Sequence, residues 1–350
     1  MKRNRLWLLL AAFLSAAVLT ACGTGEENAD DSSSSEENAG GEQSAGEEEA
    51  DSDQVYTIGA TQIEEHPSLD AAYEGFQAAI NDSGLEVEFK YESAQGDQNN
   101  AITIANNFVA DGVDLIFANS TPSAQSALQA TSDIPILFTS VTDAVEAGLV
   151  EANDQPGENI TGVLDLHPDA ITSTVAFIEE NYPGATVGLI YDAGEANSVA
   201  QINAVNAAIE GTDLSTAEAT VGNSSEVQQA ATSLVGEADV IYIVTDNTVV
   251  SALESVIGVA EEQSIPLIVG EPDSVKRGGF AAYGFSYYDI GYRTGEMAVE
   301  ILKGEKTTAD FPVEIPPNLD LYLNKAAAEA QGVEWNDAWD EEAELVETEE

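Results

Sequence analysis

The 350-residue sequence predicts an α/β protein made of two doubly wound parallel-sheet lobes with a cleft between them. Three observations support this fold class. From Val55 onward, short apolar runs alternate with amphipathic helical patterns, which is typical of βαβ units. A stretch of the first half recurs in the second half at a constant spacing. In addition, 43% of the residues are hydrophobic, as expected of packed domains rather than of a disordered acidic chain.

Residues 1–21 have the features of a secretory signal peptide. Three basic residues precede an apolar run from Leu6 to Leu19, which is 14 residues long and too short to span a bilayer. The following Leu19-Thr-Ala-Cys22 is similar to the bacterial lipobox, which implies that Cys22 is lipidated and becomes the mature N-terminus. The alternative is that Cys22 is simply a small residue of the signal. Because it is the only cysteine, a disulfide or a thiolate zinc site within the chain is excluded.

Residues 22–54 are expected to form a disordered acidic tether. The segment from Gly23 to Asp53 contains no large apolar residue, so burial cannot offset the entropy lost on ordering it. We therefore expect the folded part to stand off the membrane surface.

The elements of the first lobe follow from apolar runs of strand length and from helical patterns that start at polar or proline residues. The expected strands are Val55–Ala60, Val87–Tyr91, Asp114–Ala118 and Ile136–Thr139. The expected helices are Ser68–Ser83, Asn99–Asp111 and Pro122–Thr131.

The second lobe repeats this alternation, and one further helix follows it. The expected strands are Thr186–Tyr191, Ala217–Val221, Val240–Thr245, Leu267–Gly270 and Ala281–Phe285. The expected helices are Asp169–Tyr182, Ser198–Glu210, Ser225–Gly236, Val249–Gln263 and Tyr288–Lys303. We assign residues 55–162 and 285–312 to the first lobe, 163–284 and 313–337 to the second, and 338–350 to an acidic tail.

An internal repeat relates the two lobes. Asp114-Leu-Ile-Phe-Ala-Asn-Ser-Thr121, followed by Ser126-Ala-Leu, matches Asp239-Val-Ile-Tyr-Ile-Val-Thr-Asp246, followed by Ser251-Ala-Leu, at one offset of 125. An Ile-Pro pair opens a strand in both lobes. The alternative is a chance match of short apolar strands. The repeat aligns Ser120 with Thr245, Thr121 with Asp246, and Ser140 with Glu271.

The candidate binding residues are those that follow the strands, because ligands of open α/β sheets bind beyond the carboxyl ends of the strands. They are Gln62, Glu65, Ser120, Thr121, Thr139, Ser140, Asn197, Asp246, Asn247 and Glu271. One lobe offers hydroxyls where the other offers carboxylates, which fits a zwitterionic amino acid held across the cleft. The alternative is that these residues are ordinary helix caps and turn residues.

Several other chemistries are excluded. With 64 acidic and 10 basic residues, the net charge is −54, which argues against binding to nucleic acid or to an anionic membrane surface. Only two histidines are present, so a histidine metal site is not expected. There is no nucleophile elbow, Walker loop or dinucleotide fingerprint. We therefore expect no catalytic residues, no cofactor and no metal.

The candidate residues lie within longer motifs that resemble a known family. These are Thr61-Gln-Ile-Glu-Glu-His-Pro-Ser-Leu-Asp70, Ala94-Gln-Gly-Asp-Gln98, Ile134-Pro-Ile-Leu-Phe-Thr139, Gly194-Glu-Ala-Asn-Ser-Val199, Thr245-Asp-Asn-Thr-Val-Val250 and Asp273-Ser-Val-Lys-Arg277. The chain resembles the ABC-transporter substrate-binding lipoproteins of the tryptophan/tyrosine-binding type over about residues 55–335. The more acidic surface is a departure from that family.

The resemblance implies a type I periplasmic-binding-protein fold that traps a small ligand by hinge closure. The implied ligand is an amino acid, which in some members of the family is aromatic. It implies delivery to an ABC permease and its ATPase from a lipid-anchored position on the outer face of the plasma membrane. It also implies a monomer that performs no chemistry. The alternative function is a surface adhesion or sensory lipoprotein with the same fold.

Two sets of residues have open roles. His66 precedes a helix, where it is either a ligand contact or part of the turn. The second set is an aromatic cluster that either lines the cleft or packs in the core. It consists of Tyr283, Phe285, Tyr287, Tyr288 and Tyr292.

The acidity is not confined to the termini. Residues 54–325 contain 42 acidic residues against 7 Lys or Arg, a difference of −35. Such a surface suggests a saline medium, in which screening relieves the repulsion between like charges.

Overall fold

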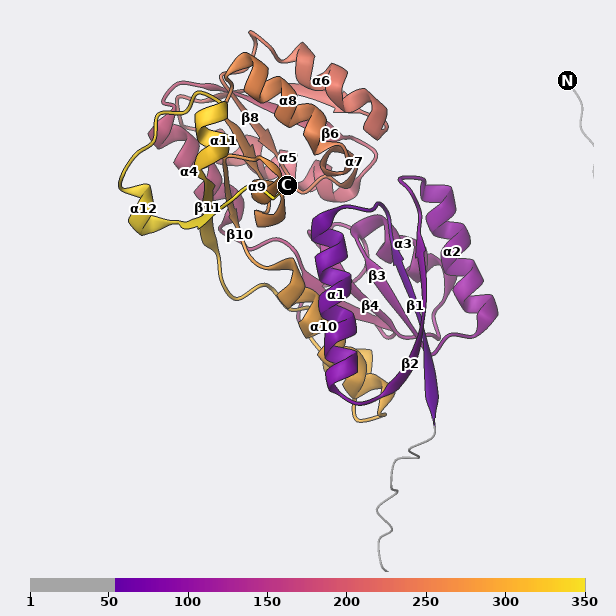
Figure 1. Ribbon diagram of the computed structural model, residues 1–350. Coiled ribbons are helices and arrows are strands. Elements are labelled where there is room, and N and C mark those ends of the chain that lie inside the picture. Colours follow the sequence, from indigo (N-terminus) through magenta and orange to yellow (C-terminus); the bar gives the residue numbers. More distant parts are fainter. Residues whose placement is uncertain (1–53, 350) are drawn as a thin grey trace, which may run out of the picture. The chain divides into compact units, whose positions relative to one another are not determined.

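The computed structural model describes residues 54–349, which form two lobes, each built on its own sheet (Figure 1). The expected α/β class with two parallel-sheet lobes is confirmed. The predicted signal peptide, Cys22 and all but the last residue of the predicted tether lie outside the described residues. Among residues 54–349, no helix is both long and apolar enough to cross a membrane.

The first lobe contains a parallel five-stranded sheet in the order β2-β1-β3-β4-β5. Strands β3, β4 and β5 are buried along their whole length, because helices cover both faces of the sheet. The strands are β1 (Val55–Gln62), β2 (Glu86–Ser93), β3 (Leu115–Asn119), β4 (Ile136–Val141) and β5 (Ile160–Leu164). The helices are α1 (Pro67–Asp82), α2 (Gln98–Asp111), α3 (Thr121–Ala130) and α10 (Tyr287–Leu302), with a short 3₁₀ turn at Thr308–Asp310.

The second lobe contains a seven-stranded sheet in the order β12-β11-β10-β9-β8-β6-β7. All neighbours are parallel except β10 and β11. The strands are β6 (Thr186–Asp192), β7 (Ser215–Val221), β8 (Val240–Ile243), β9 (Leu267–Val269), β10 (Ala281–Gly284), β11 (Asp320–Asn324) and β12 (Glu344–Val346). The helices are α4 (Ala170–Asn181), α5 (Ala196–Ile209), α6 (Val227–Ser233), α7 (Asn247–Ser251), α8 (Leu253–Gln263), α9 (Pro272–Arg277), α11 (Lys325–Ala330) and α12 (Trp339–Glu342), with a 3₁₀ turn at Ser224–Glu226.

The two sheets share one topology, which accounts for the repeat in the sequence. The order β2-β1-β3-β4-β5 of the first lobe corresponds to β7-β6-β8-β9-β10 of the second. The matched stretches are β3 with the start of α3 and β8 with the start of α7. The helix caps differ from the alignment by one residue, since Ser120 caps α3 and Asp246 caps α7.

The structure differs from the sequence-based expectations in several places, and strand β11 and helices α9 and α11 are among the elements that were not expected. Strand β5 was not expected, because its five residues lie between turns and carry no alternating pattern. The single helix expected over Val249–Gln263 is two helices, α7 and α8, which meet at Ala252. The segment 338–350 is not a free acidic tail. Trp339 is 5% exposed within the core of the second lobe, and β12 pairs with β11, so burial of this indole fixes the segment despite its charge.

The chain passes between the lobes three times. Residues 165–169 join β5 to α4, residues 285–286 join β10 to α10, and residues 311–319 lead from the first lobe to β11. The third segment rests on the first sheet, because Val163 and Glu314 form a parallel bridge. These crossings are the positions about which the lobes can rotate.

Helices α1 and α10 lie side by side on the first sheet at unusually close range (Figure 1). Gly75 of α1 faces the backbone of Tyr288, and Gly291 and Gly295 of α10 face the backbones of Ala72 and Phe76. A Cβ at any of these three positions would overlap main-chain atoms, which cannot move aside as a flexible side chain can. Three glycines thus set the distance between the helices.

We expect Gly291→Ala to lower the free energy of unfolding by about 3 kcal/mol, because the added methyl group forces α1 and α10 apart. Urea denaturation followed by circular dichroism measures the change. The matched control is Gly258→Ala in α8, where a Cβ has no neighbour within 4 Å and helix propensity favours alanine by about 1 kcal/mol. Equal stabilities of the two variants would refute the close-packing argument.

Candidate functional site

A small enclosed cavity lies where the two lobes meet. Its volume is about 10 Å³ for the centre of a water-sized sphere, which is room for about one water molecule. An amino acid does not fit in this space, so entry of such a ligand requires the lobes to separate or the lining side chains to move. The lining residues are His66, Ser68, Leu69, Ser140, Asp165, Thr245, Asp246, Asn247, Val250, Glu271 and Tyr287.

Asp246 is a fully buried carboxylate at the start of α7. Its Oδ1 accepts a hydrogen bond from the Val249 backbone N–H at 2.7 Å. Its Oδ2 accepts from the Asp192 backbone N–H at 2.6 Å and from the Ser198 hydroxyl at 2.7 Å. Burial, together with the nearby Glu195 carboxylate, raises the pKa of Asp246 to about 8. Its acceptor sites are largely taken by the second lobe itself.

Glu195 holds the same helix start from the other side. Its Oε1 accepts from the backbone N–H and the hydroxyl of Thr248 at 3.1 and 2.9 Å. Its Oε2 accepts from the side-chain amides of Asn247 and Asn197 at 2.5 and 3.0 Å. Two carboxylates therefore share the N-terminus of α7, where free N–H groups stabilise negative charge.

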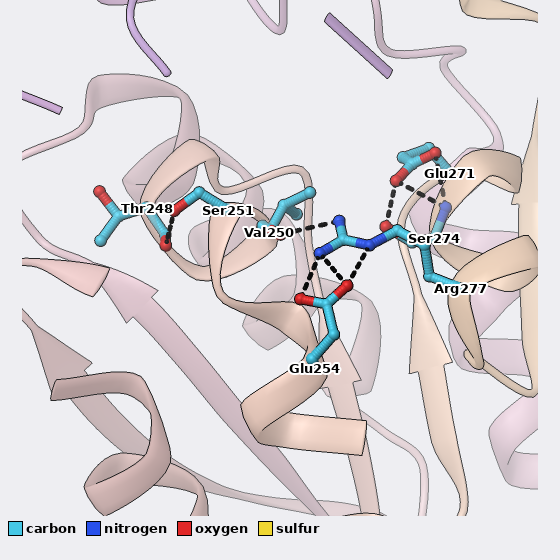
Figure 2. Close-up of polar contacts among 7 residues, drawn as sticks. All are labelled: Thr248, Val250, Ser251, Glu254, Glu271, Ser274 and Arg277. Carbon is cyan, nitrogen blue, oxygen red and sulfur yellow. Dashed lines mark hydrogen bonds and ion pairs between the residues drawn. The ribbon is translucent and has the colours of Figure 1, made fainter. Parts of the chain in front are cut away.

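Glu271 caps α9 in the same manner. It accepts a hydrogen bond from the Asp273 backbone N–H at 2.6 Å. It also accepts from the Ser274 backbone N–H at 3.0 Å and from the Ser274 hydroxyl (Figure 2). Burial, and secondarily the charge of Asp273, raises the pKa of Glu271 to about 7. Like Asp246, this carboxylate is used mainly to fix a helix.

The side chain of Arg277 connects α9 to α7 and α8. Its guanidinium makes two hydrogen bonds of 2.9 Å to the carboxylate of Glu254 in α8, and Nη1 donates to the Val250 carbonyl oxygen of α7 at 2.8 Å (Figure 2). Bidentate arginine pairs are geometrically specific. The end of α9 is thereby fixed to α7, which carries two of the lining residues, Asn247 and Val250.

Asp165 is the lining carboxylate with the most unused acceptor capacity. It is 6% exposed, and it accepts only two hydroxyl hydrogen bonds, from Tyr287 at 2.9 Å and from Thr142 at 3.2 Å. A carboxylate has about four acceptor positions. Burial raises the pKa of Asp165 to about 6, while the two hydroxyls oppose the shift. At neutral pH this group is predominantly an anion, and none of the lysines and arginines within residues 54–349 forms an ion pair with it.

The first-lobe side of the site supplies neutral polar groups. Burial, and secondarily the positive charge of Arg277, lowers the pKa of His66 to about 3, so its imidazole is uncharged. Within residues 54–349, neither of its ring nitrogens has a hydrogen-bond partner, and the same holds for the hydroxyls of Ser68, Thr121 and Thr139. Buried polar groups are normally paired, so these atoms are available to a ligand.

Ser140 reaches the cavity through an unusual backbone conformation. Its φ angle of 56° lies in the left-handed region, which residues other than glycine seldom adopt. Its hydroxyl donates to Asn119 Oδ1 at 2.7 Å, which holds the turn after β4 in place. Such strain is concentrated at functional sites.

The structure separates the sequence-predicted site residues into three groups. Ser140, Asp246, Asn247 and Glu271 line the cavity. Thr121, Thr139 and Asn197 are buried, and each has a side-chain oxygen without a partner among the described residues. The third group consists of Gln62, Ser120 and Glu65, and like the second group it does not line the cavity. Gln62 donates to Asp70 at 2.8 Å inside the first lobe, Ser120 bonds Ser123 as a helix cap, and Glu65 is exposed.

Seven lining residues were absent from the predicted set: His66, Ser68, Leu69, Asp165, Thr245, Val250 and Tyr287. Ligands of such sheets bind at the carboxyl ends of strands, and Asp165 is the residue that follows β5. Because β5 was not predicted, Asp165 was not selected as a candidate. His66 and Tyr287 had been left open between site and packing. Of the predicted aromatic cluster, only Tyr287 is among the lining residues, whereas Tyr288 is exposed and stacks on Tyr292.

The charge of the cavity defines what it can bind. Three carboxylates face it, and none of the described residues that line it is a lysine or an arginine. The site therefore offers a good environment for a ligand cation, next to neutral donors and acceptors that suit a second polar group. No lining serine is hydrogen-bonded to His66, so the arrangement of an activated nucleophile is not present at the described site.

Comparison with known proteins agrees on one family. A family model described as ABC transporter substrate binding protein matches residues 57–346. The tyrosine-binding protein of Clostridioides difficile (strain R20291) is 38% identical over 329 residues, which is 92% of this chain and 90% of that protein.

Solved structures point the same way. A conserved domain protein from Vibrio cholerae has a TM-score of 0.80 at 36% identity, over 85% of this chain and 100% of that chain. An ABC domain in complex with L-Trp from Streptococcus pneumoniae has a TM-score of 0.79 at 30% identity, over 84% of this chain and 100% of that chain.

A third solved structure differs in its conformation. The ligand-free, open structure of a substrate-binding protein with adhesive properties from Clostridium difficile is 38% identical over 84% of this chain and 100% of that chain, but its TM-score is only 0.62. The lower score despite the higher identity agrees with the small cavity. Both indicate that the present conformation is a closed one.

Protonation of the buried cavity carboxylates gives stability a pH dependence. In the folded state the pKa of Glu271 is about 7, against 4.5 for an ordinary glutamate, so the folded state binds more protons between these values. The resulting stability is fully present below pH 4.5 and is lost as the pH rises through 7. We expect Glu271→Gln to remove about 2–3 kcal/mol of this pH-dependent change.

Thermal unfolding of the full chain at half-unit steps from pH 4.5 to 8 measures the effect. The exposed Glu262→Gln in α8 serves as the control, because its charge change is similar but its side chain is solvated. If the pH curve of Glu271→Gln runs parallel to that of the wild type, Glu271 is ionised in the folded state across this range, and the assignment is wrong.

Proposed function

The chain belongs to the ABC transporter substrate-binding protein family, and from this membership we propose that it captures an aromatic amino acid by closure of its two lobes. In this role it presents the ligand to an ABC permease that is driven by a separate ATPase. The observation that carries the proposal is the buried Asp165 carboxylate in a cavity with no lysine or arginine among its described lining. A ligand with an ammonium group supplies the missing charge.

Asp165 is the proposed partner of the ligand ammonium. Asp246 and Glu271 each accept two or more backbone N–H groups, whereas Asp165 accepts none through its side chain. A buried carboxylate that is held by two hydroxyls gains most from a charged donor. This assignment replaces the earlier expectation that Asp246 or Glu271 binds the ammonium.

The first lobe is the proposed binding site of the ligand carboxylate. The hydroxyls of Ser68, Thr121 and Thr139 are buried without partners among the described residues, and a hydroxyl donates readily to an anion. Thr121 is also the first residue of α3, where backbone N–H groups are free. A zwitterion would thus have its two charges placed on opposite sides of the site.

The aromatic character of the ligand rests on the relatives and on one local feature. One relative at 38% identity is a tyrosine-binding protein, and one at 30% identity is a complex with L-Trp. Tyr287 lines the cavity and stacks on Phe285 with ring centroids 5.9 Å apart. An aromatic ligand side chain can extend this stack.

The remaining aspects of the role follow the family. We propose that the protein works outside the cytoplasm as a monomer, held at the outer face of the plasma membrane through lipid on Cys22. It carries out no reaction, and binding needs no cofactor. The rotation that opens the site takes place at the three segments that cross between the lobes.

A second candidate role is adhesion. A solved relative at 38% identity is described as a substrate-binding protein with adhesive properties. Adhesion would use the exposed surface rather than the cavity, so it is compatible with ligand capture. Binding of the full chain to host-matrix proteins, measured with and without L-tyrosine, distinguishes an adhesive surface from a ligand-dependent one.

We expect Asp165→Asn to weaken binding of L-tryptophan and L-tyrosine about 100-fold, equivalent to about 3 kcal/mol, because a buried ammonium loses its counter-charge. An asparagine at this position can still bond to the hydroxyls of Thr142 and Tyr287, so the fold should persist. Isothermal titration of the full chain gives the dissociation constants.

The matched control is Asp169→Asn, which changes the same charge at an exposed position of the same crossing segment. It should leave affinity unchanged. Equal affinities of Asp165→Asn and the wild type would disprove the ammonium assignment. Failure of the wild type to bind any amino acid, sugar or nucleoside would disprove the receptor function itself.

A further inference from the structure

A hydrogen-bonded chain of side chains connects the second lobe to the first across the closed site. It starts at Thr245, which lines the cavity, and runs through Gln201 of α5 to Thr142, which follows β4 in the first lobe. It ends at Asp165, which also lines the cavity, and at Tyr287. Gln201 is 1% exposed and Thr142 is 3% exposed, so both are shielded from water.

The orientation of the Gln201 amide sets the donors and acceptors of this chain. Gln201 Oε1 accepts from the Thr245 backbone N–H at 3.2 Å, which fixes the orientation of the side-chain amide. Its Nε2 is then the donor to Thr245 Oγ1 at 2.7 Å and to Thr142 Oγ1 at 3.2 Å, and the Asn197 carbonyl oxygen lies at the longer distance of 3.4 Å. Because the Thr142 hydroxyl accepts from Gln201, its single proton is free to go to Asp165 Oδ1 at 3.2 Å.

We propose that Gln201 is a latch that couples ligand binding to closure of the lobes. Gln201 is a positioning residue that acts on the ligand through Thr142 and Asp165. The proposal rests on the function assigned above, in which Asp165 holds the ligand ammonium. A ligand ammonium on Asp165 holds this carboxylate as an anion, which is the form that accepts the Thr142 proton and so leaves the Thr142 oxygen to accept from Gln201. The bond from Gln201 to Thr142 joins the two lobes and exists only while they are together.

The latch has a definite energetic consequence. When the lobes separate, Gln201 and Thr142 exchange their mutual hydrogen bond for bonds to water, so this bond stabilises only the closed state. A substitution of either residue also leaves its partner without a hydrogen bond in the closed state, which destabilises the closed state further relative to the open one. Removal of the latch should therefore destabilise the closed state alone and increase the rate at which ligand leaves.

Two variants test the latch in the full chain. Gln201→Leu removes both donor and acceptor at nearly constant size, and Thr142→Val removes the hydroxyl without changing the shape. We expect each to raise the dissociation rate of L-tryptophan and L-tyrosine about tenfold, with the association rate unchanged. Stopped-flow fluorescence measures both rates.

Two further variants are controls. Gln331→Leu removes an equally buried glutamine whose amide bonds the Leu267 N–H and the Gly278 carbonyl oxygen within the second lobe. Thr142→Ser keeps the hydroxyl. Both should release ligand at the wild-type rate, whereas a general loss of stability would raise the rate in Gln331→Leu as well.

A second measurement does not depend on the ligand. Hydrogen exchange of the ligand-free chain should be faster over residues 141–150 of the first lobe when Gln201 of the second lobe is replaced. Equal exchange and equal dissociation rates in Gln201→Leu and the wild type overturn the latch. If the wild type binds neither amino acid, the proposed ligand class fails, and the exchange experiment alone decides whether the latch exists.

Discussion

The buried Asp165 carboxylate is the interaction on which the closed site depends. It accepts hydrogen bonds from Tyr287 at the start of α10 and from Thr142 after β4, and its backbone N–H donates to the Val141 carbonyl oxygen. Two of the three crossing segments and the end of a first-lobe strand therefore meet at one charged group. A buried charge of this kind is costly unless it is compensated, which is the physical basis of the proposed ammonium partner.

The other two cavity carboxylates, Asp246 and Glu271, mainly stabilise helix starts. Asp246 and Glu271 each satisfy free N–H groups at a helix start, and this capping positions α7 and α9 at the cavity. Ordinary capping and ligand binding were offered as alternatives for these residues. In the structure Asp246 and Glu271 cap helices and also line the cavity, so a carboxylate at a strand end can be a helix cap and a site residue at once.

Much of the fold was predictable because hydrophobic periodicity and helix starts are local signals. The expected strand at Val55 and the helix at Ser68 agree with β1 and α1 to within a few residues, and the repeat at an offset of 125 follows from the shared strand order. The errors have physical causes. Strand β5 is short and wholly buried, and the acidic segment after Ala338 is fixed by the burial of one indole, Trp339.

The sequence alone determined the fold class, the two related lobes, the candidate edge of each sheet and the acidic character of the protein. Only the tertiary structure decided which strand-end residues face a common cavity, since that depends on how two sheets far apart in sequence approach each other. The tertiary structure also shows which carboxylates are saturated with hydrogen bonds, because saturation depends on three-dimensional neighbours, and on this ground we propose Asp165, in place of Asp246 or Glu271, as the partner of the ligand ammonium. For the same reason, it alone brought Gln201 to Thr142, 59 residues away along the chain.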